Sequence, residues 1–122
     1  MYASNGQKSD YGGHDNFHYN NVYAYLDTGF GLVWQEPGHF DYFHSNHVVL
    51  NADGDYGAAA NYCTKPTLVL YNNTVYSPTG KVTECGMPLD KWVSLGHDKG
   101  STAHPYPEDS VLLEIMRQTL NY

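Results

Sequence analysis

NFHYNNVY, residues 16–23, is the first of three segments that share one pattern, a short aromatic or β-branched run that carries an asparagine. The other two segments are DYFHSNHV, residues 41–48, and LVLYNNTV, residues 68–75. Turn-forming residues flank the runs, so strands and loops are expected to alternate regularly along the chain. The repeated asparagines are Asn21, Asn46 and Asn73, which are 25 and 27 residues apart.

This repeat of about 25 residues predicts an all-β solenoid of parallel strands. Helices do not explain it, because residues 27–31 and 51–57, which lie between the runs, are too rich in glycine for helix interiors. Each coil would pair its strands with those of the next coil, and stacked inward asparagines would bond each other's amides. An antiparallel sandwich with hairpins at similar spacing is the alternative.

Two segments of the chain resemble right-handed parallel β-helix proteins, the pectate-lyase-like superfamily. LVLYNNTVY, residues 68–76, is similar to their coils. LDKWVSLGHDKGS, residues 89–101, looks like the segment after their last coil, where a tryptophan-containing turn leads through Gly-x-Asp and a serine into a proline-containing tail. The resemblance covers about residues 16–120 and implies a short right-handed parallel β-helix that interacts with polysaccharides.

The expected domain is the whole chain, residues 1–122, with about three coils in residues 12–86 and a tail with a helix in residues 87–122. Full members of the superfamily have many more coils. We therefore expect either the C-terminal part of a longer protein or a chain whose open N-terminal coil is covered by a partner chain or a second copy.

The C-terminal segment predicts an amphipathic α-helix. Pro107 suits the first helical position, and Glu108 and Asp109 follow in the first turn, where carboxylates favour the positive end of the helix dipole. We expect this helix to cap the open end of the solenoid, since an unpaired sheet edge is an aggregation hazard. The apolar residues expected on its inner face are Val111, Leu112, Ile115, Met116 and Leu120.

The composition excludes several classes of partner. The chain has 13 acidic and 6 basic residues and a formal charge of −7, which argues against binding nucleic acid through its phosphates and against a polybasic membrane anchor. No apolar run is long enough to span a membrane. We therefore expect neither a nucleic-acid nor a membrane partner.

Three features predict an extracellular glycoprotein. Cys63 and Cys85 are 22 residues apart, which does not fit a C-x-x-C motif and predicts a structural disulfide, worth about 3 kcal/mol through loop closure. Two buried thiols are the alternative. Residues 72–74, Asn-Asn-Thr, match the glycosylation sequon. A composition low in lysine and rich in tyrosine, asparagine and glycine also suggests secretion.

The densest group of ionisable side chains lies in and before the second run. If the strand alternates, Asp41 and His47 share one face and His44 the other, although a bend at the asparagine would change the facing of His47. Stacking of the coils would place His44 beside either His18 or Tyr19, according to whether 26 or 25 residues separate equivalent positions. A histidine can exchange protons near neutral pH, and an aspartate can orient it. The alternatives are a structural role and metal binding. The candidate catalytic residues are Asp41, His44 and His47, and the candidate substrate-binding residues are His18, Tyr19, Trp34, His39 and Tyr71.

Neither class of polysaccharide enzyme is specified. A lyase resembling the best-known β-helix members would use a lysine or arginine base. Five of the six basic residues follow the first run and lie off all three runs, namely Lys65, Lys81, Lys91, Lys99 and Arg117. A glycoside hydrolase needs two carboxylates about 5–10 Å apart. Asp41 has candidate partners in Asp15 and Asp53, at unknown distances.

No cofactor is expected. Asn51, Asp53 and Asp55 have the alternating spacing of a calcium loop, but tyrosines replace the glycine and the glutamate that an EF-hand needs, so a solvated turn is the preferred interpretation. Carbohydrate interaction is the expected function, as a polysaccharide lyase or glycoside hydrolase. The alternatives are a non-catalytic carbohydrate-binding or structural module with an exposed aromatic strip, and an extracellular assembly subunit.

Overall fold

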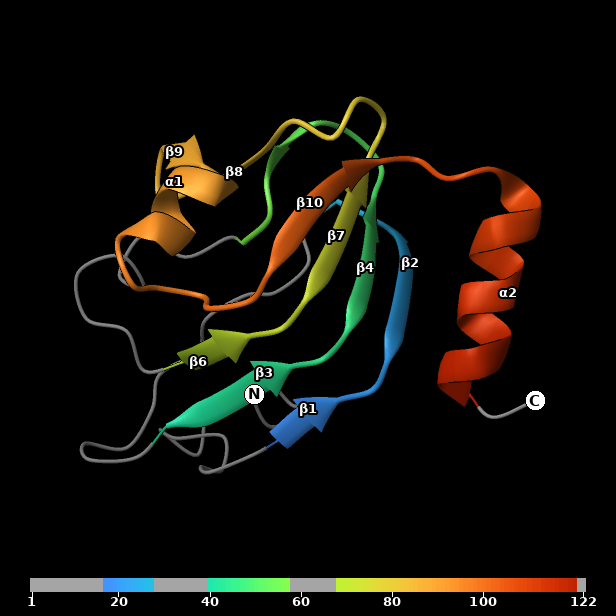
Figure 1. The fold of residues 1–122 in the computed structure, drawn as a ribbon, viewed down its shortest axis with the longest axis horizontal. Helices are drawn as coiled ribbons and strands as arrows, with labels where there is room; N and C mark the ends of the chain where they lie inside the picture. The colour runs from blue at the N-terminus through green and yellow to red at the C-terminus, as the bar shows by residue number, and fades with distance from the viewer. Residues whose placement is uncertain (1–16, 28–39, 58–67, 121–122) are drawn as a thin grey trace, which may run out of the picture.

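The computed structural model describes residues 17–27, 40–57 and 68–120 (Figure 1). The strands are β1 (Phe17–Tyr19), β2 (Val22–Leu26), β3 (Asp41–His44), β4 (His47–Leu50), β5 (Gly54–Asp55), β6 (Leu68–Tyr71), β7 (Thr74–Ser77), β8 (Val82–Glu84), β9 (Met87–Pro88) and β10 (Thr102–Pro105). The helices are α1 (Leu89–Ser94) and α2 (Asp109–Leu120).

The strands form three sheets. The first sheet has the order β1-β3-β6, the second β10-β7-β4-β2 and the third β5-β8-β9. All pairings in the first two sheets are parallel, and in the third sheet β5 pairs parallel with β8, while β8 pairs antiparallel with β9. The chain runs through these sheets in the same order in each repeat, as Figure 1 shows, and we call each such repeat a pass. The prediction of a mostly β chain with parallel pairing is confirmed, and the pairing is not that of an antiparallel sandwich.

The strand register follows the repeat of the sequence. Tyr19 lies beside His44, and His44 lies beside Tyr71. The sequence left open whether His18 or Tyr19 would be the neighbour of His44, and the observed spacing of 25 residues selects Tyr19. The next pair in this column is an isolated bridge between Tyr71 and Lys99.

A left-handed residue makes the corner between the first and second sheets on each pass. Asn20, Ser45 and Asn72 have φ values of 55°, 58° and 55°. Asparagine adopts this conformation more readily than most residues, which explains the paired asparagines in the first and third segments. Gly100, at φ 79°, takes the same place in the tail, where a Cβ atom would lie 2.0 Å from Asn72 Oδ1.

The asparagine after each corner residue joins neighbouring passes. The N–H of Asn21 donates to Asn46 Oδ1 at 3.0 Å, and the N–H of Asn46 donates to Asn73 Oδ1 at 3.0 Å. The side-chain amides of Asn46 and Asn73 in turn donate to the carbonyls of His18 and Phe43. The stacking of asparagines was predicted, but the expected bonds between side-chain amides were wrong, because the side chains bond the backbone instead. The backbone N–H and C=O groups at the corner need such partners where the strand ladder is interrupted.

Ser101 ends this series of bonds. Its hydroxyl accepts from the N–H of Asn73 at 2.9 Å and donates to Asp98 Oδ1. Serine therefore takes the place of asparagine in the tail, and β10 continues the second sheet beside β7.

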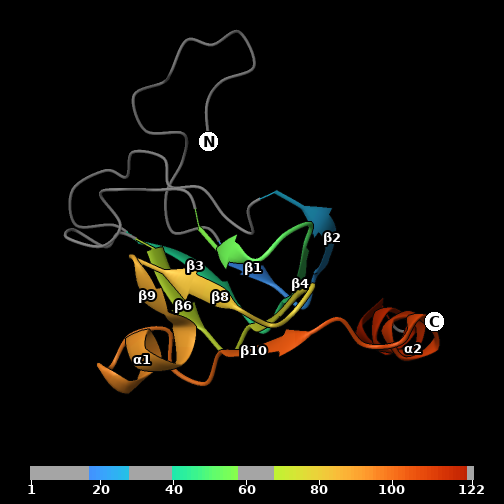
Figure 2. The ribbon, with the colours of Figure 1, turned by 90° about the horizontal axis from the view of Figure 1, so that it is seen from above.

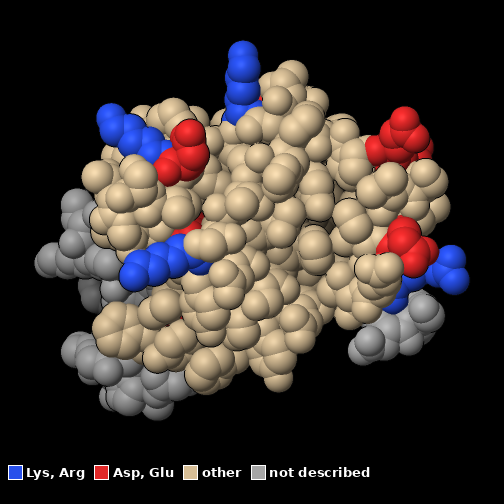
Figure 3. Space-filling model, in the orientation of Figure 1, with Lys and Arg blue, Asp and Glu red and all other residues tan. Residues whose placement is uncertain are grey.

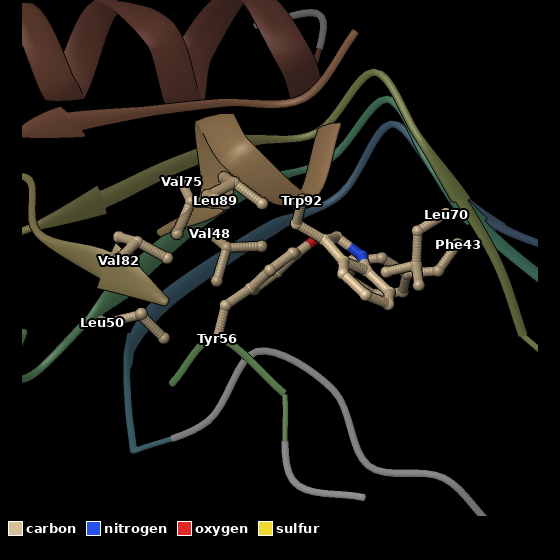
Figure 4. Close-up of a cluster of buried hydrophobic side chains, with 9 residues drawn as sticks. All are labelled: Phe43, Val48, Leu50, Tyr56, Leu70, Val75, Val82, Leu89 and Trp92. Atoms are coloured by element: carbon tan, nitrogen blue, oxygen red, sulfur yellow. The ribbon is translucent and has the colours of Figure 1, made fainter. Parts of the chain in front are cut away.

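The apolar core lies between the sheets and is closed by α1 (Figure 4). Val48 and Val75 are fully buried neighbours in β4 and β7. Leu89 and Trp92 reach into the core from α1 and are almost fully buried. The full cluster is Phe43, Val48, Leu50, Tyr56, Leu70, Val75, Val82, Leu89 and Trp92.

The C-terminal helix forms as predicted but covers a different surface. Leu112 packs with Val49 and Tyr76 on the outer face of the second sheet, with Ile115 and Met116 beside it, and Figure 2 shows α2 outside that sheet. The expectation that α2 caps the open end of the stack was therefore wrong. The reason is that Val49 and Tyr76 form an outward apolar patch. Val111, which was expected on the inner face, is 49% exposed.

Cys85 is disulfide-bonded, and the described residues contain no free cysteine. The other cysteine of the chain, Cys63, lies outside the described residues, so the pairing of Cys63 with Cys85 stays a prediction. In the described part of the chain, neither helix is long and apolar enough to cross a membrane.

Candidate functional site

Three rings stack in a row on the outer face of the first sheet. The ring centroids of Tyr19 and His44 are 5.2 Å apart and those of His44 and Tyr71 are 4.5 Å apart, with interplanar angles of 2° and 3°. We call Tyr19, His44 and Tyr71 the aromatic row. The row exists because parallel strands in register place equivalent side chains directly above one another.

A second column of side chains lies beside the aromatic row. Phe17 stacks on Tyr42 with ring centroids 4.4 Å apart, and Tyr42 is in register with Val69. The alternation of β3 turns Tyr42 and His44 outward and Asp41 and Phe43 inward. The two columns together make a largely aromatic surface on the first sheet.

The stacked rings present their edges and polar atoms to solvent. Within the row each ring face contacts the next ring, so an outside molecule meets the tyrosine hydroxyls and the imidazole edge. The exception is the edge strand β1, where Phe17 and Tyr19 are 56% and 53% exposed. Among the described residues no further ring covers their outer faces. The surface therefore offers hydrogen-bonding groups along its length and open ring faces at one end.

Polar groups extend the aromatic row. The Nδ1 atom of His44 lies 2.9 Å from the hydroxyl of Ser45, which leaves Nε2 as the outer nitrogen of that ring. Lys99 follows Tyr71 in the column and is exposed. Hydroxyl and neutral imidazole groups can both donate and accept hydrogen bonds, so the row can match ligand groups that do the same.

The outer surface of the first two sheets is almost free of charge. Among the residues of their described strands, Asp41 alone is an Asp, Glu, Lys or Arg, and its side chain is inward and 9% exposed. Figure 3 shows one face of the molecule, on which Lys, Arg, Asp and Glu side chains are few and scattered. This surface is polar through hydroxyl and imidazole groups.

The three candidate catalytic residues do not converge. Asp41 points into the core side of β3, whereas His44 belongs to the aromatic row on the opposite face. His47 lies past the left-handed corner at Ser45, on the outer face of the second sheet, where its ring is 6.5 Å from that of Tyr76. Burial lowers the pKa of His47. A catalytic role for these residues stays a prediction that their placement does not favour.

The candidate substrate-binding residues are divided by the fold. Tyr19 and Tyr71 lie in the aromatic row, as the repeat suggested. His18 is in register with the inward residue Phe43, at a ring distance of 6.5 Å, and is not part of the row. Trp34 and His39 lie outside the described residues.

Sequence reasoning missed other members of this surface. Phe17 and Tyr42 were not proposed as binding residues, although strand alternation already placed Tyr42 on the face of His44. Ser45, whose hydroxyl lies beside the imidazole of His44, was also missed. The signal for Phe17 was its position two residues before Tyr19 on the same strand.

The carboxylates of the proposed calcium loop have partners within the fold. Asp53 accepts from the hydroxyl and the N–H of Thr79 at 2.6 and 3.0 Å. These bonds lower the pKa of Asp53 to about 2, and the bond from the hydroxyl has the larger effect. Asp55 accepts from the hydroxyl of Thr83, and the amide of Asn51 donates to Asp27. In the described ranges, no group of three or more His, Cys, Asp or Glu side chains is arranged to hold a metal. The preferred interpretation of this segment as a solvated turn, with calcium binding as the alternative, stays a prediction.

A buried pair of carboxyl groups was not foreseen. Glu84 and Asp98 are 2% and 5% exposed, and Asp98 contacts Glu84 and Asn73. Burial raises the pKa of Asp98, while hydrogen bonds with Ser101, Glu84 and Asn73 lower it. The pair lies at the end of the asparagine series, where Asp98 accepts from the hydroxyl of Ser101.

Comparisons with protein-family models, with curated proteins and with solved structures find no match to this chain.

Proposed function

We propose that the chain is a short right-handed parallel β-helix of about three coils. The parallel first and second sheets and the series of corner asparagines support this assignment. A right-handed path is expected because connections between parallel strands of one sheet almost always have that hand.

We further propose that the protein is a non-catalytic carbohydrate-binding module for an extracellular polysaccharide. The observation that carries this proposal is the aromatic row on an exposed sheet face. Sugars combine apolar C–H faces with hydroxyl groups, and tyrosine combines a large apolar ring with a polar hydroxyl. Neighbouring strands are about 4.8 Å apart, so the row offers similar groups at regular intervals to a polymer of similar units.

Binding is favoured over catalysis because of how the ionisable groups are placed. A hydrolase needs two carboxylates on either side of one bond. Asp41 carries the one carboxylate in the described strands of the first two sheets, and that carboxylate is directed inward. A lyase of the β-helix type would need a cation on the sheet face, and the described strands of the first two sheets contain neither lysine nor arginine.

Two features support an extracellular location. Disulfides persist in oxidising compartments, and Cys85 is disulfide-bonded. Asn72, the acceptor of the sequon, is exposed at the corner between the sheets. Both are compatible with passage through a secretory route.

A glycan-binding titration tests this function. Wild-type protein, Tyr19→Ala and Tyr71→Ala are titrated calorimetrically with a panel of soluble polysaccharide fragments. We expect at least one glycan to bind and each substitution to weaken it by about tenfold or more, which corresponds to about 1.4 kcal/mol. Tyr25→Ala is the matched control, since Tyr25 is 55% exposed but lies on β2 of the second sheet. Circular dichroism confirms that each variant is folded.

Two outcomes would overturn the proposal. One is that no glycan of the panel binds, or that neither Tyr19→Ala nor Tyr71→Ala changes the affinity for the glycan that binds. The other is turnover, detected as new reducing ends or as the absorbance of unsaturated products, that His44→Ala abolishes.

A further inference from the structure

We infer that the aromatic row selects uncharged glycan chains and discriminates against polyuronates, chains with a carboxylate on each sugar. This inference rests on the proposed carbohydrate-binding function and names the ligand class of the same surface. It is carried by the charges around the row.

The described residues offer almost no cations to an anionic chain that lies along the row. Lys99 is the one lysine or arginine of the described chain that continues the column of Tyr19, His44 and Tyr71. The other described cations lie elsewhere: Lys81 precedes β8, Lys91 is in α1, and Arg117 in α2 is 3.8 Å from Glu114. Within the described part of the chain, a single lysine at one end of the row leaves the remaining carboxylates of a bound polyuronate without a cation.

An unpaired carboxylate would lose hydration on this surface without compensation. Burying an ionised group costs far more than burying a hydroxyl unless a cation or several donors meet it. The whole chain adds to this cost, because its formal charge of −7 repels a polyanion before contact. Both effects act against polyuronates and leave neutral glycans unaffected.

The groups on the surface suit sugar hydroxyls. The hydroxyls of Tyr19, Tyr71 and Ser45 and the imidazole of His44 each donate and accept hydrogen bonds, as a sugar hydroxyl does. These groups follow one another from strand to strand, so the expected ligand lies along the row and across the strands. The neighbouring column of Phe17, Tyr42 and Val69 then provides an apolar flank.

A matched pair of ligands tests the inference. Wild-type protein is titrated with neutral oligosaccharides, including an oligogalactan, and with oligogalacturonate of the same length, at low and at moderate ionic strength. We expect a neutral oligosaccharide to bind, and Tyr71→Ala to weaken this binding. Oligogalacturonate is expected to bind the wild-type protein about tenfold more weakly than the neutral oligosaccharide, or not at all. Added salt is expected to increase any residual uronate binding, because it screens the repulsion.

The outcomes separate the two proposals. Binding of oligogalacturonate as tight as that of its neutral counterpart, and sensitive to Tyr71→Ala, would overturn the ligand class while the carbohydrate-binding function stands. Failure of all neutral and anionic oligosaccharides to bind would overturn both.

A gain of function gives an independent test. Val69 lies on the outer face beside Tyr71 and is partly exposed, so Val69→Lys places a cation next to the row. We expect Val69→Lys to acquire oligogalacturonate binding that salt weakens, whereas Val69→Gln, of similar length but uncharged, does not. Equal behaviour of the two variants would contradict a role for missing cations in the discrimination.

Discussion

Asn46 and Asn73 show how one residue type can specify a repeat. Each is fully buried, and each uses its carbonyl for the N–H of the pass before it and its amide for a carbonyl of that same pass. An apolar residue of similar size would leave two backbone groups without partners, each a cost of about 1–3 kcal/mol. The periodic asparagine could therefore be recognised in the sequence, because its carboxamide both accepts and donates a hydrogen bond at the equivalent place of successive repeats.

Gly80 is a residue whose side chain is excluded by the backbone. Its φ is 79°, and a Cβ atom there would lie 2.7 Å from the nitrogen of Pro105 and 2.9 Å from the carbonyl carbon of His104. Gly86 has a similar φ of 77° with open space around it. We expect Gly86→Ala to cost about 1–2 kcal/mol through backbone strain alone.

Gly80→Ala is expected to cost clearly more than Gly86→Ala, because β10 must also move away. Urea unfolding of both variants measures the difference. Equal losses would show that the contact between this turn and β10 contributes nothing to the free energy of unfolding.

Asp98 makes stability depend on pH. Because burial raises its pKa in the folded state above 3.8, the folded protein holds a proton that the unfolded chain releases. The stabilisation of the folded state by this proton is complete below pH 3.8 and is lost as the pH rises through the raised pKa of Asp98. Asp98 shares the buried site with Glu84.

We expect Asp98→Asn to flatten the pH dependence of the free energy of unfolding above pH 4, since the amide can still accept from Ser101 and carries no charge. Asp90→Asn, at an exposed position of α1, is the control. Urea unfolding at several pH values measures the slope, and a slope that Asp98→Asn leaves unchanged would contradict the prediction. Asp53 acts in the opposite sense, losing its contribution as the pH falls from 3.8 towards 2.

At the scale of the elements, α2 depends on a small apolar contact with the second sheet. Leu112 is 7% exposed and packs with Val49 and Tyr76, whereas its neighbour Leu113 is 60% exposed. We expect Leu112→Ala to cost about 2–4 kcal/mol, or to detach the helix, and Leu113→Ala to be nearly neutral. Hydrogen exchange of the α2 amides distinguishes detachment from global unfolding. Similar protection in both variants would contradict this packing.

The existence of these elements could be predicted better than their positions. The period of the apolar residues in α2 indicated a helix and placed Leu112, Ile115 and Met116 on its inner face. It could not indicate the partner surface, because the patch of Val49 and Tyr76 arises only when β4 and β7 pair in register. The apolar pattern of a helix indicates which face of the helix is buried, whereas the register of the sheet determines the surface on which that face packs.

The candidate site shows the same limit at the corners of the sheets. Alternation along β3 predicted the opposite facing of Asp41 and His44, and the repeat predicted the stacking of His44 on a neighbouring ring. The left-handed conformation of Ser45 then turned His47 onto another sheet. Alternation alone could not predict whether residues on both sides of this corner converge, because one residue with positive φ changes which face the following side chains occupy.

At the scale of the whole molecule, the two ends of the stack are built differently. The C-terminal side carries α1 over the core, and β10 ends at Pro105, a residue that discourages further strand pairing. On the other side, β1 and β2 are the outermost strands of their sheets among the described residues. The expected coverage of that side by a partner chain or a second copy stays a prediction.

The central claim is that an uncharged glycan binds along the aromatic row. The most direct test is to follow the backbone and imidazole resonances of the protein by NMR during titration with a neutral oligosaccharide that binds. The account predicts that the largest shifts centre on Tyr19, His44 and Tyr71 and extend to Ser45, with little change at His47. Shifts that centre on His47 and Tyr76, or elsewhere on the second sheet, would contradict it.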